Sequence, residues 1–436
     1  MAHRLIRWIT VTIMVATAVA APAALGQAEP AAAALPTCAE PDPGQDFDRR
    51  PPQDLGFGPG FTAALDAVRA QRLTNIAVNV YRNGCQVYSS EPERNGLATQ
   101  SFSVAKSVSA MGVARAVRLG LLTFDSTVGE FVPQADPAHA VVTVRDLLTM
   151  TAGTDYDVTR DYGAAYVNNL DDWLSRPIVH PPGNYFQYDQ SLPAVLDRLV
   201  ARASGIPFRE FVRTELFGPL GIGDQEWQWL PSSDGDVAGY WNLWTTARTY
   251  AKLGELMRLG GAWHGNQLLA PEFIDQVARP TPANGHYGLM FWTNAGTTGT
   301  TPMTMQDRRE ISGRFVPGAP DSLYGMWGIL GQRVMIEPEA GIVIQASGAE
   351  VIGQRDPIDA ALNLWDGDAR LDWLLTQAVF TNTLDPQPLS STPFGGETAH
   401  GWAPDQGLLH TLFHPEQLLG MTDPTRRILE WLQSMR

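Results

Sequence analysis

The segment TQSFSVAKSVSAMGV, residues 99–113, decides the fold because it places a serine and a rare lysine at the start of an apolar helical pattern. Lys106 is one of only two lysines in a chain with 31 cationic residues, so arginine supplies almost all of the positive charge. Apolar side chains recur at helical spacing after Ser103, and Gly120 gives the pattern a natural end. The spacing predicts a helix that begins just after Ser103 and carries Lys106 in its first turn.

The serine and the lysine form a chemically meaningful pair. Ser103 and Lys106 are spaced i and i+3, which places them on one face of the helix, one turn apart. A serine hydroxyl is a weak nucleophile until a neighbour takes its proton. Lysine can do so when burial lowers its pKa, whereas arginine stays protonated. Ser103 would also lie at the positive end of the helix. The hypothesis is a nucleophile with a lysine base; the alternative is a chance Ser-x-x-Lys.

Strand patterns occur at both ends of the body, and helical patterns lie between them. Residues 74–90 alternate apolar and polar side chains around Asn83-Gly84, which predicts a hairpin because these residues adopt the positive φ angles of a tight turn. Residues 331–347 form two apolar runs around a turn. The helical patterns cover residues 191–206, 208–222 and 245–261. This order predicts an α+β fold, with an antiparallel sheet built from N- and C-terminal strands and an inserted, mostly helical region.

The chain divides into four parts by composition. Residues 1–34 begin with basic side chains and continue as an apolar run rich in small residues, which is typical of a secretory signal peptide. An uncleaved membrane anchor is the alternative. We expect an extended arm over 35–62, the folded domain over 63–384 and a C-terminal extension of unknown role over 385–436. An exported chain is expected to be secreted, periplasmic or held in the cell envelope, without stable membrane insertion after signal cleavage.

The acidic charge balance argues against one class of partner. The net charge is −15, whereas a nucleic-acid-binding protein needs a basic face to neutralise phosphates. No nucleic-acid partner is therefore expected. Lys252, the other lysine, lies among exposed-looking positions of a helical pattern and is interpreted as a surface residue.

Cysteine and histidine usage predicts a disulfide and no metal site. Cys38 and Cys85 are the two cysteines of the chain, and export permits a bridge that would pin the N-terminal arm to the body. Two independent buried thiols are the alternative. Among eight histidines none stands in an HExxH pattern, and His410 and His414 lack a nearby third ligand, so their role is interpreted as structural. Neither a metal nor a cofactor is expected.

Several segments, taken in order, resemble the serine β-lactamase and penicillin-binding-protein superfamily. Residues 101–133 are similar to its nucleophile block, and Tyr188 stands in a Tyr-x-Asn-like motif before a strong helix. Residues 328–344 look like its Gly-x-x-Gly-Gln strand with a Pro-Glu turn. The resemblance spans about residues 63–380. It is nearest to the class C-like branch, which includes esterases, D-aminopeptidases, D,D-carboxypeptidases and 6-aminohexanoate-dimer hydrolases.

The resemblance implies a role for each site residue. Ser103 would be the nucleophile, and Lys106 would shuttle protons. Tyr188 would act as phenolate base toward Ser103 and as acid toward the leaving group, coupled to Lys106. The oxyanion hole would use the backbone N–H groups of Ser103 and Ile329. Taken alone, Tyr188 could equally be an aromatic core residue.

Departures from the family pattern concern the substrate-binding positions. Gln190 stands two residues after Tyr188, where the family usually has Asn or Ser, and its amide has a different reach. Trp327-Gly328 and the following isoleucine occupy the place of Lys-Thr-Gly and lack the cation that meets a β-lactam carboxylate. Trp327 could line an acyl pocket or pack in the core. Arg333 lies nearby, but its side chain is expected to point away from this position if successive side chains of the strand alternate between its two faces.

These features predict an exported serine hydrolase that acts on a small ester, amide or peptide through an acyl-enzyme on Ser103. A penicillin-recognising D,D-peptidase or β-lactamase is the alternative within the same chemistry. An inactive protein that binds cell-wall peptide or a partner is the alternative from another class. The oligomeric state stays open.

Overall fold

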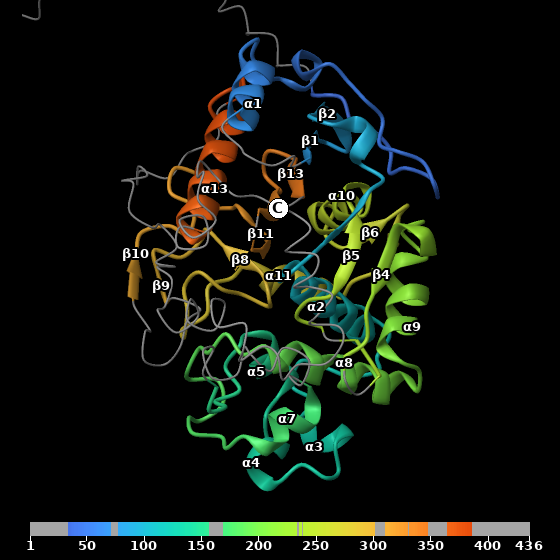
Figure 1. Cartoon of the computed structure of the whole chain (residues 1–436), viewed down its shortest axis with the longest axis vertical. Helices are drawn as coiled ribbons and strands as arrows, with labels where there is room; N and C mark the ends of the chain where they lie inside the picture. The colour runs from blue at the N-terminus through green and yellow to red at the C-terminus, as the bar shows by residue number, and fades with distance from the viewer. Residues whose placement is uncertain are drawn as a thin grey trace, which may run out of the picture. The chain divides into compact units, whose positions relative to one another are not determined.

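A six-stranded antiparallel sheet joins strands from both ends of the body (Figure 1). The computed structural model describes residues 34–70, 77–156, 169–232, 235–237, 239–300, 310–329, 331–347 and 364–385, which belong to the unit Leu35–Arg436 apart from Ala34. The predicted signal peptide up to residue 33, the extension beyond residue 385 and the histidine pair His410 and His414 lie outside these ranges.

The sheet confirms the predicted α+β architecture. Its order is β2-β1-β13-β12-β11-β8, so the N-terminal hairpin pairs directly with the C-terminal strands. Asn83 and Gly84, with φ of 50° and 77°, make the hairpin turn that their sequence predicts. The strands are β1 (Ala77–Arg82), β2 (Cys85–Ser89), β8 (Trp292–Thr293), β11 (Tyr324–Gly328), β12 (Gln332–Glu337) and β13 (Ile342–Ser347).

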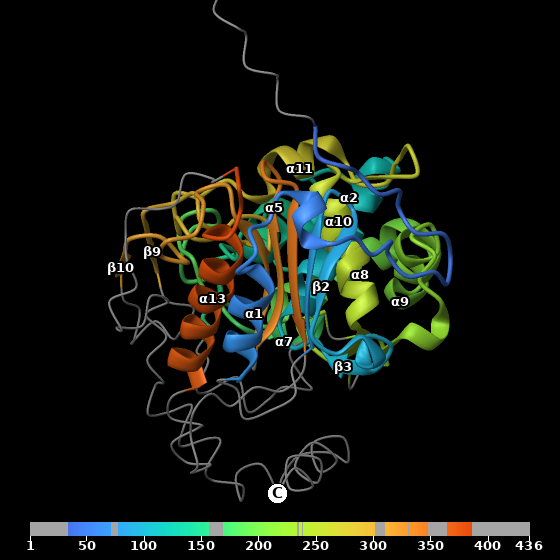
Figure 2. The same ribbon diagram turned by 90° about the horizontal axis from the view of Figure 1, so that it is seen from above.

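Helices cover both faces of this sheet. On one face α1 (Phe61–Ala70) packs beside α13 (Leu364–Phe380), and on the other α10 (Ala247–Arg258) lies against β12 and β13 (Figure 2). A methyl group at Gly254 of α10 would lie 2.7 Å from a methyl carbon of Val343. Glycine at this position therefore allows the close approach of helix and sheet.

The inserted helical region centres on α2 (Val104–Arg118), which packs against α8 (Ser191–Ser204). The predicted helix over 208–222 is instead the short α9 (Phe208–Val212) continued by a π-helical turn, Arg213–Phe217. The other helices here are α3 (Val128–Phe131), α4 (Pro137–Ala140), α5 (Val144–Leu148), α7 (Leu170–Ser175) and α11 (Pro271–Val277). A second sheet has the order β3 (Ala98–Gln100), β5 (Leu243–Thr246), β4 (Trp227–Trp229).

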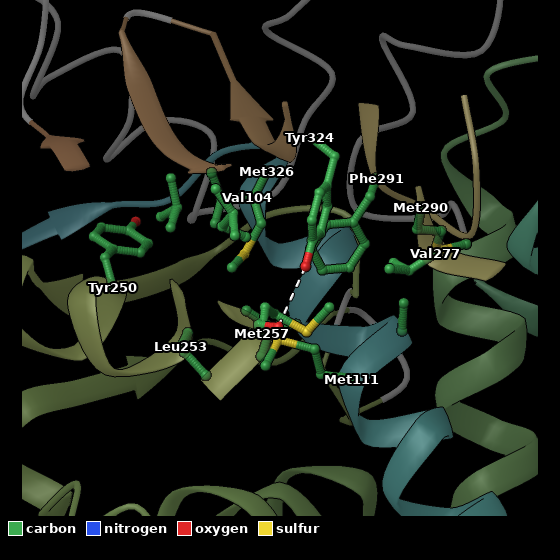
Figure 3. Close-up of a cluster of buried hydrophobic side chains, with 14 of the residues drawn as sticks. Val104, Met111, Tyr250, Leu253, Met257, Val277, Met290, Phe291, Tyr324 and Met326 are labelled. Atoms are coloured by element: carbon green, nitrogen blue, oxygen red, sulfur yellow. Dashed lines mark hydrogen bonds between the residues drawn. The ribbon is translucent and has the colours of Figure 1, made fainter. Parts of the chain in front are cut away.

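A buried cluster of apolar side chains fixes α2 against the large sheet (Figure 3). Met111 of α2, Met257 of α10 and Tyr324 of β11 meet there, and the Tyr324 hydroxyl donates a hydrogen bond to the Met257 carbonyl oxygen at 3.3 Å. Val104, the first residue of α2, is also fully buried in this cluster. Residue 104 follows Ser103 directly, so the core holds the start of α2 in place.

The N-terminal arm is tied to the hairpin by the predicted disulfide. Cys38 and Cys85 are bonded, with their Cα atoms 5.1 Å apart, and the Cys38 N–H donates to the Asn83 carbonyl oxygen at 2.9 Å. The prediction of a bridge is confirmed. The arm ends in a 3-10 turn, Pro52–Leu55, before α1. None of the helices in the described part of the chain has both the length and the apolar composition that a membrane crossing needs.

The prediction that Lys252 lies at the surface is wrong. Its side chain is fully buried on α10, and its Nζ donates to the Gly221 carbonyl oxygen at 3.0 Å. Almost every residue of α10 is buried, because the helix is covered on sides other than the one facing the sheet. Periodicity alone does not reveal such additional cover.

Candidate active site

Ser103 lies at the mouth of α2, at the end of a strained turn. Ser101 donates its N–H to the Leu243 carbonyl oxygen at 2.7 Å, which ties the turn to β5. Phe102 has a φ of 47°, a left-handed conformation that costs a bulky residue about 1–3 kcal/mol. Ser103 itself is the N-cap residue of α2. Strain of this kind clusters at functional sites because it presents a side chain in a fixed direction.

Lys106 binds Ser103 directly from within the core. Its side chain is 1% exposed, and its Nζ donates to the Ser103 Oγ at 2.9 Å and to the Tyr240 carbonyl oxygen at 3.2 Å. Burial lowers the pKa of Lys106 well below its ordinary value. A lysine with a lowered pKa gives up its own proton more readily and can then accept the serine proton, and arginine could not. The contact with Tyr240 comes from a distant loop and has no signal in the local sequence.

Tyr188 completes a three-residue cluster. The Lys106 Nζ lies 4.7 Å from the centroid of the Tyr188 ring, so the end of the lysine side chain faces both the serine and the tyrosine. Tyr188 precedes α8, and the packing of α8 on α2 brings the two segments together. Its ring also contacts Tyr287 and Trp292, with centroids 6.1 Å and 5.9 Å away.

The two neighbouring tyrosines differ in their surroundings. Burial raises the pKa of Tyr287 well above its ordinary value, and the proximity of Tyr188 adds to this effect. Tyr287 therefore remains a neutral phenol near neutral pH. Tyr188 is partly exposed, and its ring faces the Lys106 Nζ. Tyr287 and Trp292 belong to a stretch without clear periodicity, and sequence reasoning did not find them.

The end of β11 touches the backbone of the Ser103 turn. A methyl group at Gly328 would lie 2.5 Å from the Ser101 carbonyl oxygen and 3.2 Å from the Ser103 backbone nitrogen. Only glycine permits this approach without a shift of the backbone. Ile329, the next residue, is partly buried against the core. The contact brings together the two chain segments that were expected to supply the oxyanion-hole donors.

Trp327 and Arg333 both turn toward α13. Trp327 is 3% exposed, stacks edge-on against Phe315 and donates its indole N–H to Asp372 at 2.8 Å. Of the two roles considered for Trp327, lining an acyl pocket and packing in the core, these contacts favour packing in the core. Arg333 pairs with the same Asp372 carboxylate at 2.6 Å and also donates to the Gly328 carbonyl oxygen, so its guanidinium is engaged by groups of the protein itself.

The residues after Tyr188 cap α8. Asp189 is 1% exposed, and its Oδ1 accepts hydrogen bonds from the Ser191 N–H at 2.8 Å and from the Ser191 hydroxyl at 2.5 Å. Arg176 lies 3.4 Å from the same oxygen. Burial raises the pKa of Asp189 to about 6, although Arg176 opposes the shift. Gln190, predicted as a substrate-binding residue, is buried directly before the helix.

A groove lies away from this cluster. It has a volume of about 580 Å³ and runs beside α9 and β4, where Arg209, Trp229 and Asp236 contribute to its walls. Neither Ser103 nor Tyr188 lines it. Within the ranges given above, no three histidine, cysteine or acidic side chains gather closely enough to hold a metal ion.

Two curated proteins are similar to parts of this chain. It is 30% identical over 200 residues to Esterase EstB of Burkholderia gladioli, which covers 38% of this chain and 51% of the esterase. It is 33% identical over 135 residues to Penicillin-binding protein 4 of Amycolatopsis lactamdurans, which covers 28% of this chain and 34% of that protein. The chain thus spans about half of the first relative and about a third of the second.

Comparison of folds and of family patterns agrees with the resemblance seen in the sequence. The solved structure of a novel penicillin-binding protein homologue from Caulobacter crescentus has a TM-score of 0.53 and 18% identity, covering 74% of this chain and 99% of that one. At this identity the likeness shows the fold alone. A family model described as Beta-lactamase matches residues 61–350, more than half of the chain, including Ser103, Lys106 and Tyr188. The chain therefore belongs to the Beta-lactamase family.

Proposed function

We propose that this protein is an exported serine hydrolase that cleaves a small ester or amide through an acyl-enzyme on Ser103. The observation that carries the proposal is the position of Lys106. Its buried Nζ lies 2.9 Å from the Ser103 Oγ and faces the Tyr188 ring at 4.7 Å. Burial lowers the pKa of this lysine, as proton transfer from serine requires.

The reaction follows from this arrangement. The Lys106–Tyr188 pair takes the Ser103 hydroxyl proton as the Oγ attacks the carbonyl carbon of the substrate. The resulting oxyanion would be bound by the N–H groups of Ser103 and Ile329. The carbon–oxygen or carbon–nitrogen bond then breaks, and Tyr188 returns a proton to the leaving group. Water, deprotonated by the same pair, hydrolyses the acyl-enzyme and regenerates Ser103.

Esters are the favoured substrate class. The similarity to an esterase supports this choice. Arg333, the cation nearest in sequence to the end of β11, is already engaged by Asp372 and by the Gly328 carbonyl oxygen. The stretch at Trp327 therefore offers no cation for the carboxylate that a β-lactam carries. Amides and small peptides remain within the same chemistry.

A penicillin-recognising D,D-peptidase is the second candidate, and the similarity to a penicillin-binding protein favours it. Covalent trapping of Ser103 by benzylpenicillin, seen as an added mass, distinguishes it from the esterase. A non-catalytic binding protein is the third reading. It is supported if Ser103→Ala changes no measurable activity.

Export is part of the proposal. The Cys38–Cys85 bridge supports it, because structural disulfides persist in oxidising compartments. The N-terminal segment has the composition of a signal peptide. The expected location is secreted, periplasmic or cell-envelope bound.

The test is the intact mass of the protein after treatment with a fluorophosphonate probe. Wild type is expected to gain one adduct, and Ser103→Ala and Lys106→Arg none. Ser204→Ala, at the far end of α8, is the matched control and is expected to label like wild type. Absence of labelling in wild type, or equal labelling of Ser103→Ala, would refute the assignment.

A further inference from the structure

A fully buried ion pair lies behind the end of β11 and has no place in the mechanism above. Arg333 of β12 is 2% exposed, and Asp372 of α13 is not exposed at all. The Arg333 Nε donates to the Asp372 Oδ1 at 2.6 Å, and the Trp327 indole N–H donates to the other carboxylate oxygen at 2.8 Å. One carboxylate therefore holds side chains from two adjacent strands.

The guanidinium uses its other donors on backbone. Arg333 Nη1 donates to the carbonyl oxygen of Gly328 and, at 2.8 Å, to that of Gln332. A buried ion pair gives little net stability, because the desolvation of both charges offsets their attraction. The hydrogen bond to Gly328 is the contact with a local consequence, since Gly328 touches the Ser103 turn.

That contact determines the direction of the next N–H group. The Gly328 carbonyl and the Ile329 N–H belong to one planar peptide unit and point in opposite directions. With the carbonyl bound to the guanidinium of Arg333, the Ile329 N–H, in the turn that follows β11, points away from that guanidinium. Among described residues, β8 pairs with Tyr324 and Gly325 of β11 and no further. The N–H thus lies past the end of that pairing, on the strand end that meets Ser103.

The hydrogen bond from Arg333 is needed because residue 328 is a glycine. The close approach to Ser101 requires a residue without a side chain, and such a residue leaves the flanking peptide unit unusually free to rotate. Rotation would turn the N–H away. A bond from a rigid, planar guanidinium, itself held by a carboxylate, opposes that rotation.

We propose that Arg333 is a positioning residue for catalysis: through the Gly328 carbonyl, and held by Asp372, it directs the Ile329 N–H toward the oxyanion that forms at Ser103. This inference rests on the proposed hydrolase function. Arg333 does not touch the substrate. Its effect falls on the stabilisation of the tetrahedral intermediate and not on the binding of the ester.

The experiment measures kcat and KM for p-nitrophenyl acetate and the inhibition constant of phenylboronic acid, which forms a tetrahedral adduct on an active-site serine. Removal of an oxyanion-hole donor lowers kcat by about 10²–10³-fold, and misdirection of one is expected to cost about 10–100-fold. Arg333→Met should lower kcat and weaken phenylboronic acid by similar factors, with KM within about threefold. Arg333→Lys should restore part of both.

Arg82→Met is the matched control. Arg82 is equally buried and also donates to backbone carbonyls, those of Leu55 and Ala340, but it lies at the opposite end of the sheet. Its loss should lower the melting temperature and leave kcat and the boronate constant of the folded enzyme unchanged. If Arg333 had only a structural role, Arg333→Met would likewise lower the melting temperature and leave kcat and the boronate constant unchanged.

Wild-type kcat and wild-type boronate affinity in Arg333→Met would overturn the proposal. If that variant does not fold, Asp372→Asn, which keeps the size of the side chain, is judged by the same two constants. Fluorophosphonate labelling of wild type at Ser103 is measured in parallel. Its absence refutes the hydrolase function itself, whereas labelling with unchanged constants in the variants refutes only the role of Arg333.

Discussion

Substitution of Gly328 by alanine tests how closely the end of β11 must approach the Ser103 turn. The added methyl carbon would lie 2.5 Å from the Ser101 carbonyl oxygen and 3.2 Å from the Ser103 nitrogen. Both neighbours are backbone atoms, so neither can rotate away as a flexible side chain could. The strand end and the turn must separate.

The size of the effect follows from the overlap. The distance to Ser101 is about 0.9 Å short of the 3.4 Å at which ordinary contact begins. A displacement of about 1 Å between reacting groups costs about 10²-fold in rate, or about 2.7 kcal/mol of activation free energy. The added methyl group also overpacks the core, which is expected to lower the free energy of unfolding by roughly 1–3 kcal/mol. We expect kcat of Gly328→Ala to fall about 10²-fold while the protein still folds.

The assay is ester hydrolysis with thermal unfolding measured on the same samples. Gly96→Ala is the matched control, because a methyl group there meets nothing within 4 Å and the residue does not require a positive φ. That variant should keep wild-type kcat and melting temperature. If Gly328→Ala retains kcat within about threefold of wild type, the close contact between Gly328 and the Ser103 turn does not determine the reaction rate. The expected loss of about 10²-fold is then refuted.

Three further predictions concern stability. Because burial depresses the folded-state pKa of Lys106, the unfolded chain binds more protons between that pKa and about 10.4, so wild-type stability rises with pH in this window. Lys106→Met should therefore raise the melting temperature at pH 7 more than at pH 10, and an equal or negative change at pH 7 would contradict this. Asp189 has a folded-state pKa raised to about 6 from 3.8, so the folded protein binds the extra proton and its free energy of unfolding falls as pH rises through this window. Asp189→Asn keeps the Oδ1 acceptor for the Ser191 N–H and should abolish that fall in urea titrations; a fall of the same size in the variant would assign it to another group. The Cys38–Cys85 bridge closes a loop with a sequence separation of 47. Its removal by the double Cys→Ser variant should lower the free energy of unfolding in guanidinium by about 4 kcal/mol, and an unchanged value would show that the arm does not restrain the unfolded chain.

The sequence was most informative where contacts are local. The i, i+3 spacing of Ser103 and Lys106 places both on one helical face whatever surrounds the helix, and their 2.9 Å contact agrees with that expectation. Asn83-Gly84 determines the hairpin turn in the same way, because the positive φ angles are properties of the residues themselves.

Contacts between distant segments could not be read in this way. The Tyr240 carbonyl that binds Lys106, and Asp372, which holds Arg333, are joined to their partners only by the tertiary fold. Lys252 was misjudged for the same reason, since its neighbours come from outside its own helix. The family resemblance supplied Tyr188, whose approach to Lys106 depends on the packing of α8 against α2.

The pairing of β1 with β13 affects how the protein can fold during its synthesis. One edge of β1 pairs with β2, and the other pairs with β13, where Ala77 lies opposite Ser347. That second edge has no partner until the chain has been synthesised as far as β13. Before that moment a nascent chain can form the hairpin and the helices of the insertion, but not the sheet on which they rest. Contacts of such long range form late and slowly. A chain released before residue 342 would contain Ser103 and α2 but lack β13, so it could not complete the six-stranded sheet.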